Sequence, residues 1–296
     1  MAPNIDIIPH NKIDIAKWDA CVADSPHQNV FMYTWALNSL CDDWSGIVLD
    51  DYKAVLPLPW RSKAGIKYVY QVPFLPRLSL MSKEPVANGK AILAFASRHF
   101  LLINTVIDNI HPADAWISRE KTNYYIPLDK GYHEIAASYT PSCKKNIHKA
   151  VTRGCTIGDR VDTELVIDLY NAAYGKLQAH HTRQDYQPAR QLVTAALQHN
   201  MAQTWNVSDT ENNELLYGAI TLHEKNRIYY WMGAPTPAGR QNRATYFFID
   251  HLLQTYAGTG MIWDFEGSSI ASVADFYRQF GPAEESFFEI RKFSLF

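Results

Sequence analysis

One stretch near the C-terminus joins a strand-like apolar run to side chains that can take part in acid–base chemistry. Residues 263–269, WDFEGSS, pass from tryptophan and phenylalanine into two carboxylates, a glycine and two hydroxyls. A strand with this ending typically presents its last polar side chains to a site. Because side chains alternate along a strand, we expect Asp264 and Glu266 on one face and Phe265 on the other.

The two carboxylates admit more than one interpretation. Asp264 or Glu266 beside a cleft can accept a proton from an acceptor amine, which must be neutral before it attacks an acyl carbon. Alternatively, either carboxylate accepts hydrogen bonds from the backbone N–H groups of the turn at Gly267 and Ser268, or caps the helix that follows. Catalysis, substrate binding and turn formation therefore all remain open for this segment.

A basic helix is predicted between Thr140 and Gly154. Thr140 can cap its N-terminus, Pro141 fits its first turn, and Gly154 can adopt the left-handed conformation that ends a helix. A narrow apolar stripe is expected at helical spacing from Ile147, Ala150 and Val151. The cations lie on the other side and are Lys144, Lys145, Lys149 and Arg153. They can bind the phosphates of a cofactor, a nucleotide-linked substrate or a tRNA, and a solvated helix face is the alternative.

A third candidate is the loop at residues 233–245, between a predicted strand and a predicted helix. Free backbone N–H groups and the helix dipole attract an anion at a helix N-terminus, and Arg240 or Arg243 can add positive charge there. The loop contains neither GxGxxG nor the GK[ST] of a P-loop. An ordinary connecting loop is therefore the alternative.

No metal site and no nucleophile motif are predicted. His180, His181, Asp185 and His199 lack the spacing of a helical or finger-type ligand pair. The four cysteines contain no CxxC pair, which favours free thiols in a reducing compartment. The sequence also lacks a GxSxG elbow and any Cys/His signature.

Composition limits the class of protein. The 296 residues can form two domains of ordinary size, and 47% hydrophobic with 20% charged residues is typical of a globular chain. The formal charge of −2 argues against a nucleic-acid footprint over the whole surface, and we expect no DNA partner. The first residues lack a signal-peptide pattern and no apolar run is long enough to span a membrane, so we expect a cytoplasmic protein.

The same order of predicted elements occurs twice. Each copy has three strands, a proline-containing loop, an amphipathic helix and one apolar strand, with the strands of the first copy beginning near Trp44, Ala54 and Ile66 and those of the second near Trp205, Gly218 and Ile228. We infer an internal duplication, with two unrelated α/β domains as the alternative. The predicted domains are residues 1–135 and 136–296.

Three segments carry a resemblance to a known group. The basic helix reads Lys144-x-x-Ile-x-Lys149-Ala-x-x-x-Gly154, the strand end reads Asp264-Phe-x-Gly267, and the next helix ends in Phe276-x-x-x-Phe-Gly281. With this order and spacing, the chain resembles the Fem-type branch of the GNAT acyltransferase superfamily. That branch includes peptidoglycan-bridge aminoacyltransferases and bacterial GNAT-like proteins of the Bacteroidetes type. The resemblance covers nearly the whole chain.

The resemblance implies an α/β fold of two tandem GNAT-like lobes, each a mixed sheet flanked by helices. Positions that match the family's basic helix and strand-end turn are Lys145, Lys149, Arg153, Asp264, Glu266 and Gly267. Lys292 resembles a basic residue that offsets oxyanion charge in the aminoacyl branch. The expected catalytic residues are thus Lys292, Asp264 and Glu266. The expected binding residues are Lys145, Lys149, Arg153, Arg240, Arg243, Gly267 and Ser268.

Two departures bear on the donor. CoA-dependent GNAT proteins carry R/Q-x-x-G-x-G/A before their long helix, whereas residues 239–244, GRQNRA, keep one glycine. The coiled-coil arm of some tRNA-binding Fem enzymes has no counterpart, although armless aminoacyltransferases exist in the family. We expect an N-acyltransferase that moves an acyl or aminoacyl group from acyl-CoA or aminoacyl-tRNA to a small-molecule or peptide amine, with no tightly bound cofactor. A GNAT-like protein that binds a ligand or partner without catalysis is the alternative.

Overall fold

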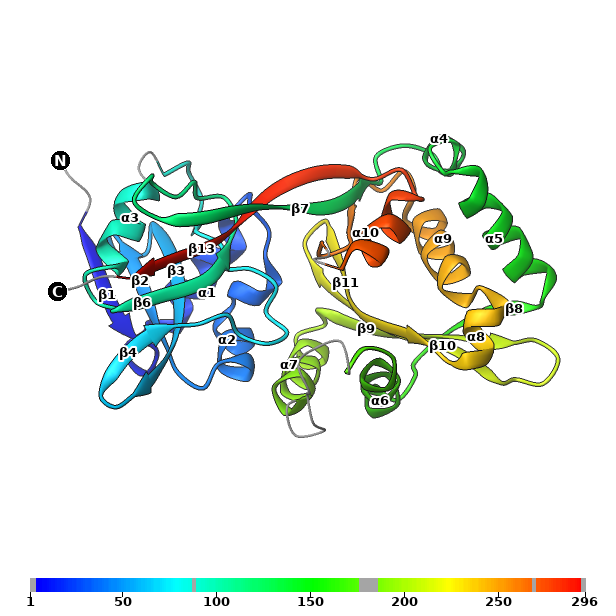
Figure 1. Cartoon of the computed structure of the whole chain (residues 1–296), viewed down its shortest axis with the longest axis horizontal. Coiled ribbons are helices and arrows are strands. Elements are labelled where there is room, and N and C mark those ends of the chain that lie inside the picture. Colours follow the sequence, from blue (N-terminus) through cyan, green and yellow to red (C-terminus); the bar gives the residue numbers. More distant parts are fainter. Residues whose placement is uncertain (1–3, 87–88, 176–185, 268–269, 294–296) are drawn as a thin grey trace. The chain divides into compact units, whose positions relative to one another are not determined.

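The chain divides into two compact units in the computed structural model (Figure 1), which describes residues 4–86, 89–175, 186–267 and 270–293. Unit 1 comprises Met1–Lys121 and Ser286–Phe296, and unit 2 comprises Thr122–Glu285. The sequence-based prediction put the domain boundary after residue 135 and assigned the C-terminal residues to the second domain. The division differs because strand β7 (Ile117–Pro127) runs from unit 1 into unit 2, and strand β13 (Ala283–Phe293) runs back.

Unit 1 is built on a mixed sheet whose strand order is β1-β2-β3-β4-β6-β13. Only β4 and β6 pair in parallel along this path. Its remaining strands are β1 (Ile5–Pro9), β2 (Trp44–Leu49), β3 (Ala54–Lys63), β4 (Ile66–Val69), β5 (Met81–Ser82, beside β3) and β6 (Leu102–Ile107). Its helices are α1 (Ile15–Asp24), α2 (Thr34–Leu40) and α3 (Gly89–Ala96), with short turns η1 (His10–Lys12) and η2 (Val30–Met32).

Unit 2 repeats this arrangement with the strand order β8-β9-β10-β11-β12-β7. Again one pair, β11 with β12, is parallel and the others are antiparallel. The strands are β8 (Cys155–Asp159), β9 (Ala202–Asp209), β10 (Leu215–Glu224), β11 (Arg227–Pro235) and β12 (Ile262–Asp264). The repeated order of elements predicted from the sequence is therefore confirmed in strand order and strand direction.

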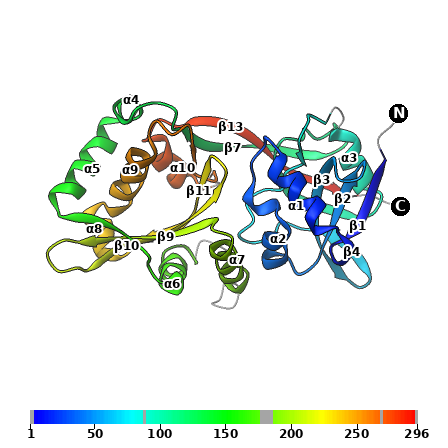
Figure 2. The same ribbon diagram turned by 180° about the vertical axis from the view of Figure 1, so that it is seen from behind.

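Helices cover both faces of the sheet in unit 2 (Figure 2). Helices α6 (Thr163–Tyr174) and α7 (Gln187–Gln198) pack on one face of β9 to β11, and α9 (Ala244–Tyr256) packs on the other. The face under α9 carries an aromatic core that contains Tyr217, Tyr230, Phe248, Trp263 and Phe265. The other helices are α4 (Tyr132–Ala137), α5 (Pro141–Thr152), α8 (Pro237–Asn242) and α10 (Ala271–Arg278).

Helix α5 has the ends that the sequence predicts. The Thr140 hydroxyl accepts a hydrogen bond from Cys143 N, Pro141 occupies the first turn, and Gly154 has a left-handed φ of +72°. The predicted apolar stripe is partly wrong, because Val151 is 55% exposed. Cys143 is fully buried in its place, since α9 covers the side of α5 that carries Cys143 and Ala150.

Helix α8 lies directly against β10, and this contact requires a glycine. Thr236 caps α8 by accepting a hydrogen bond from Gly239 N, and its own N–H donates to Leu216 O at 2.9 Å. A Cβ atom at Gly239 would overlap the Leu216 carbonyl oxygen, which is backbone and cannot rotate away. The glycine thereby sets how close the α8–α9 corner comes to the sheet.

We expect Gly239→Ala to destabilise unit 2 by about 2 kcal/mol, because the added methyl group forces α8 away from β10. Urea unfolding followed by circular dichroism measures this loss. Gly131→Ala is the matched control, since its φ is −66° and a Cβ there meets no atom within 4 Å. Equal stability of the two variants would contradict the close approach.

Candidate active site

Strand β12 pairs along its whole length, but only with the first three residues of β11. Their parallel register covers Arg227 to Tyr229 of β11 opposite Ile262 to Asp264 of β12. β12 ends there, whereas β11 continues to Pro235 with β10 on its other edge. In the described part of the chain, β11 from Tyr230 onward thus has no β12 neighbour. A bulge at Trp231, opposite the Ile220–Thr221 step, changes the direction of β11 at the same level.

A buried ionic network holds the two strands together below the separation. Arg227 Nε donates to Asp264 Oδ2 at 2.8 Å, and the Asp264 side chain is fully buried. Asn123 of β7 donates from Nδ2 to Asp264 Oδ1 at 2.9 Å and to Glu285 Oε1 at 2.7 Å. Arg227 Nη2 also reaches Glu285 Oε1 at 2.5 Å. The network joins β7, β11, β12 and β13 within unit 2.

The acidic turn does not have the strand geometry that the sequence suggests. Glu266 N donates to Asp264 Oδ1 at 2.7 Å, and the backbone at Glu266 is left-handed with φ +62°. This local hydrogen bond ends the strand at Asp264, so Glu266 does not share a strand face with Asp264. Phe265 packs with Trp263 in the aromatic core, and Gly267 follows with φ +68°.

A cavity of about 340 Å³ lies next to the separated part of β11. Its lining comes from the end of α6, from β11, from the α8–α9 corner and from α10. Arg240 and Arg243 belong to this lining, whereas Asp264 does not. The aromatic part of the lining consists of Tyr174, Tyr230, Tyr246, Phe276 and Tyr277.

The tyrosines at the base of the cavity are neutral hydroxyl donors. Burial raises the pKa of Tyr230 and of Tyr277 well above the ordinary value of 10. Tyr230 shares a short hydrogen bond with Tyr217, whose pKa burial also raises. The negative charge of Glu266 makes a smaller contribution to the raised pKa of Tyr277. A neutral phenol in this position can donate a hydrogen bond or a proton to a reacting oxygen or sulfur.

Cations of α5 lie beside the α8–α9 corner, where Arg243 lines the cavity. Arg153 of α5 donates from Nη1 to Gln241 O at 2.8 Å and thereby joins α5 to α8. Repulsion from Arg153 is the largest of the effects that lower the pKa of Lys149, followed by desolvation and by repulsion from Arg243 and Lys145. The structure thus brings Lys145, Lys149, Arg153 and Arg243 together. We call these four residues the cation cluster.

The cation cluster borders the N-terminus of α9. Arg243 is the residue before this helix and has a left-handed φ of +63°, a conformation that glycine adopts with less strain. The first N–H groups of a helix have no intrahelical acceptor and favour an anion. On the other side of the corner, the charge of Arg240 lowers the Tyr174 pKa, although burial raises it overall. Arg240 on α8 and Arg243 before α9 both line the cavity.

The remaining predicted residues lie elsewhere. Lys292 is in unit 1 on β13, opposite Ile103 of β6, and its ammonium donates to Ala115 O at 3.1 Å. Ser268 lies outside the described residues, as do His180, His181 and Asp185. Among the residues that the structure describes, no group of three His, Cys, Asp or Glu side chains is placed to hold a metal ion. No described helix is long and apolar enough to cross a membrane.

The aromatic half of the cavity is absent from the sequence-based prediction. Tyr174, Tyr230, Tyr246 and Tyr277 come from four different elements, and no spacing in the sequence connects them. One signal was available, because Tyr277 stands inside the segment 276–281 that carries the family resemblance. The 17 tyrosines of the chain alone do not indicate which of them share a cavity.

Comparison with solved structures identifies the fold. The chain is similar to FemX with a TM-score of 0.65 at 13% identity, over 96% of this chain and 97% of that one. A conserved protein of unknown function from Bacteroides thetaiotaomicron VPI-5482 gives a TM-score of 0.59 at 10% identity, covering 95% and 98%. A tandem GNAT protein from the clavulanic acid biosynthesis pathway gives 0.52 at 12% identity, covering 98% of both chains.

The chain has a tandem GNAT-like fold of the Fem type. No protein-family model and no curated protein matches its sequence. Identities this low establish the fold alone. The GNAT-like fold that the sequence resemblance implied is confirmed, and the roles of individual site residues stay predictions.

We expect Asp264→Ala to destabilise the protein by about 3 kcal/mol or more, because Arg227 then loses its buried partner. The shift of the urea unfolding midpoint measures the loss. Asp275→Ala is the control, since Asp275 forms an exposed pair with Arg278 on α10 and should cost less than about 1 kcal/mol. Similar small losses in both variants would show that the network does not support the strand ends.

Proposed function

We propose that unit 2 transfers an acyl or aminoacyl group from a phosphate-bearing donor to an amine. The observation that carries this proposal is the cation cluster beside a cavity that opens where β11 leaves β12. An acyl donor of this kind has a polyanionic part and a reactive acyl end. The cations and the α9 N-terminus are suited to the first part, and the aromatic cavity is suited to the second.

The donor is acyl-CoA or aminoacyl-tRNA, and both fit the chemistry of the cation cluster. The similar tandem GNAT protein from the clavulanic acid biosynthesis pathway was solved without AcCoA, and another similar structure is L-PGS from Bacillus licheniformis, with a TM-score of 0.54 at 11% identity. In this chain Arg243 stands where a glycine would let a pyrophosphate approach the backbone closely. We therefore propose that phosphate binding relies on guanidinium and ammonium groups more than on backbone N–H groups.

The tyrosines are proposed to assist the transfer itself. When an amine attacks the acyl carbon, charge develops on the carbonyl oxygen and then on the leaving group. The C–N bond forms as the bond from the acyl carbon to the donor's sulfur or oxygen breaks. Tyr277 is neutral and lines the cavity, so we assign it the donation of a proton to the leaving group, and the proton that the amine loses restores the phenol. Tyr230, held by Tyr217, is assigned a hydrogen bond to the carbonyl oxygen.

The predicted carboxylates and lysine receive different roles in this proposal. Asp264 positions the strand end, because its carboxylate is occupied by Arg227, Asn123 and Glu266 N. A role for Glu266 in orienting the amine rests on the family resemblance, because Glu266 is not among the residues that line the cavity. A role for Lys292 in stabilising the oxyanion rests on the family resemblance alone.

Donor binding can be tested by thermal-shift titration of the full chain with acetyl-CoA and, separately, with aminoacyl-tRNA. A ligand that binds only the native state raises its melting temperature. We expect stabilisation by one of them and roughly tenfold weaker binding in the double variant Lys149→Ala/Arg243→Ala, because charge-assisted contacts are lost. Lys130→Ala, at an exposed cation outside the cluster, should bind normally. Equal binding by both variants would contradict phosphate recognition by the cluster.

Turnover with the stabilising donor tests the tyrosine assignment. We expect Tyr277→Phe to lower kcat about a hundredfold with little change in KM, because the phenyl ring keeps the packing and removes only the proton. Tyr246→Phe is the control and should keep the wild-type kcat, because the Tyr246 hydroxyl donates its hydrogen bond to Gln279. Unchanged kcat in Tyr277→Phe would remove this residue from the mechanism. Donor binding without turnover in the wild-type protein would favour a binding protein without catalysis.

A further inference from the structure

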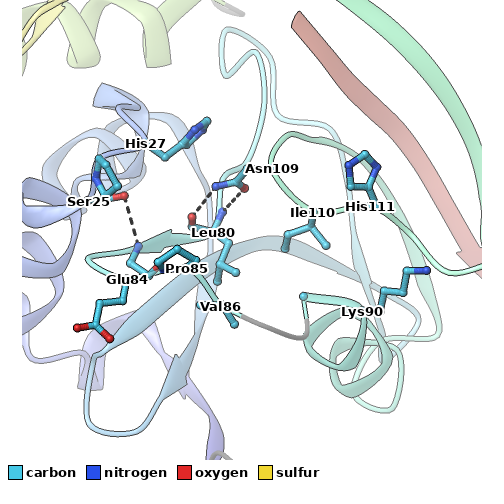
Figure 3. Close-up of a pocket in the computed structure, with 13 residues that line it drawn as sticks. Ser25, His27, Leu80, Glu84, Pro85, Val86, Lys90, Asn109, Ile110 and His111 are labelled. Atoms are coloured by element: carbon cyan, nitrogen blue, oxygen red, sulfur yellow. Dashed lines mark hydrogen bonds between the residues drawn. The ribbon is translucent and has the colours of Figure 1, made fainter.

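Unit 1 contains a second cavity, of about 430 Å³, which the proposed transfer does not use (Figure 3). Its lining comes from the segment after α1, from β5 and the chain that flanks it, from the start of α3 and from the turn after β6. All of these segments belong to unit 1. The volume is within the range of sites for small organic ligands.

The floor of this cavity is apolar and held in place. Leu80 and Ile110 are 5% and 2% exposed and both line the cavity. Asn109, with a left-handed φ of +43°, accepts a hydrogen bond from Leu80 N at 3.0 Å and donates to Leu80 O at 2.7 Å. Figure 3 shows both bonds. Because this clamp is intramolecular, a ligand need not order the floor when it binds.

One wall is supported by buried charges. His27 lines the cavity, and its Nε2 lies 3.1 Å from Asp108 Oδ1. Arg77 Nε donates to Asp108 Oδ2 at 3.1 Å. Burial by itself would raise the Asp108 pKa, but the charge and hydrogen bond of His27, the charge of Arg77 and a hydrogen bond with Ser79 lower it below the ordinary value. The ionised Asp108 thereby keeps the His27 ring at the wall.

The rim carries opposite charges on opposite sides. In Figure 3, Glu84 lies on one side of the cavity, and Lys90 and His111 lie on the other. The His111 ring also contacts Phe288, with the ring centroids 5.0 Å apart. Within the described ranges, neither Glu84 nor Lys90 forms an ion pair with another residue. Both charges are therefore available to a ligand.

We propose that this cavity binds a zwitterionic ligand with an apolar body, namely a short peptide with both termini free. Its ammonium group pairs with Glu84, its carboxylate with Lys90 and His111, and its side chains cover Leu80 and Ile110. Charges of opposite sign at the two ends of an apolar floor favour a peptide that has both a free ammonium group and a free carboxylate. This site is independent of acyl transfer in unit 2.

Isothermal titration of the full chain with the dipeptide Leu-Leu tests the proposal. We expect Leu-Leu to bind, and we expect N-acetyl-Leu-Leu and Leu-Leu amide to bind more weakly because each lacks one terminal charge. Glu84→Gln should weaken Leu-Leu roughly two- to fivefold but leave N-acetyl-Leu-Leu unchanged. Lys90→Gln should weaken Leu-Leu by a similar factor but leave Leu-Leu amide unchanged.

Lys63→Gln removes an exposed cation at the end of β3, outside the cavity lining, and should bind Leu-Leu like the wild-type protein. Circular dichroism checks that each variant is folded, which is expected because the substituted side chains are exposed. Absence of Leu-Leu binding overturns the proposal. Equal binding of free and capped peptides, or unchanged Leu-Leu binding in both Glu84→Gln and Lys90→Gln, overturns it as well. Each of these results leaves the proposed transfer reaction untouched.

Discussion

The buried ion pair between Arg227 and Asp264 ties the start of β11 to the end of β12. Arg227 begins β11 and Asp264 ends β12, so the ion pair spans the three-residue segment over which the two strands pair. Beyond that segment β11 continues alone past the bulge at Trp231, and the cavity occupies the space beside it. Because an unpaired buried charge is costly, the ion pair keeps this geometry in one register. The candidate site in unit 2 depends on it.

A second constraint is repulsion within the cation cluster. Lys149, Arg153 and Arg243 are close enough to lower the Lys149 pKa, although they belong to α5 and to the α8–α9 corner. The fold holds these elements together through the hydrogen bonds of Arg153 to α8 and through the close approach at Gly239. Bringing like charges together costs free energy that a bound polyanion recovers. This electrostatic cost supports the proposal that the phosphates of a donor bind there.

Local patterns predicted local structure well and burial less well. Thr140, Pro141 and Gly154 mark the ends of α5 correctly, because caps and left-handed ends depend on the nearest few residues. Val151 was expected in the apolar stripe but is exposed, since its burial depends on where α9 lies. Glu266 was expected on a strand but stands in a left-handed turn, because its N–H donates to the Asp264 carboxylate. Both errors come from interactions that the spacing of residues does not specify.

The sequence by itself determined the repeated unit of strands and helix, the basic helix and the Fem-type resemblance, because these depend on periodicity and on the order of motifs. It could not show that β7 and β13 each continue from one unit into the other, since strand pairing over such a distance along the chain leaves no local pattern. Only the tertiary structure brought four tyrosines from separate elements to one cavity and moved Asp264 from the expected cleft into a buried ion pair. Side chains far apart in sequence meet through packing, and packing is decided by the whole fold.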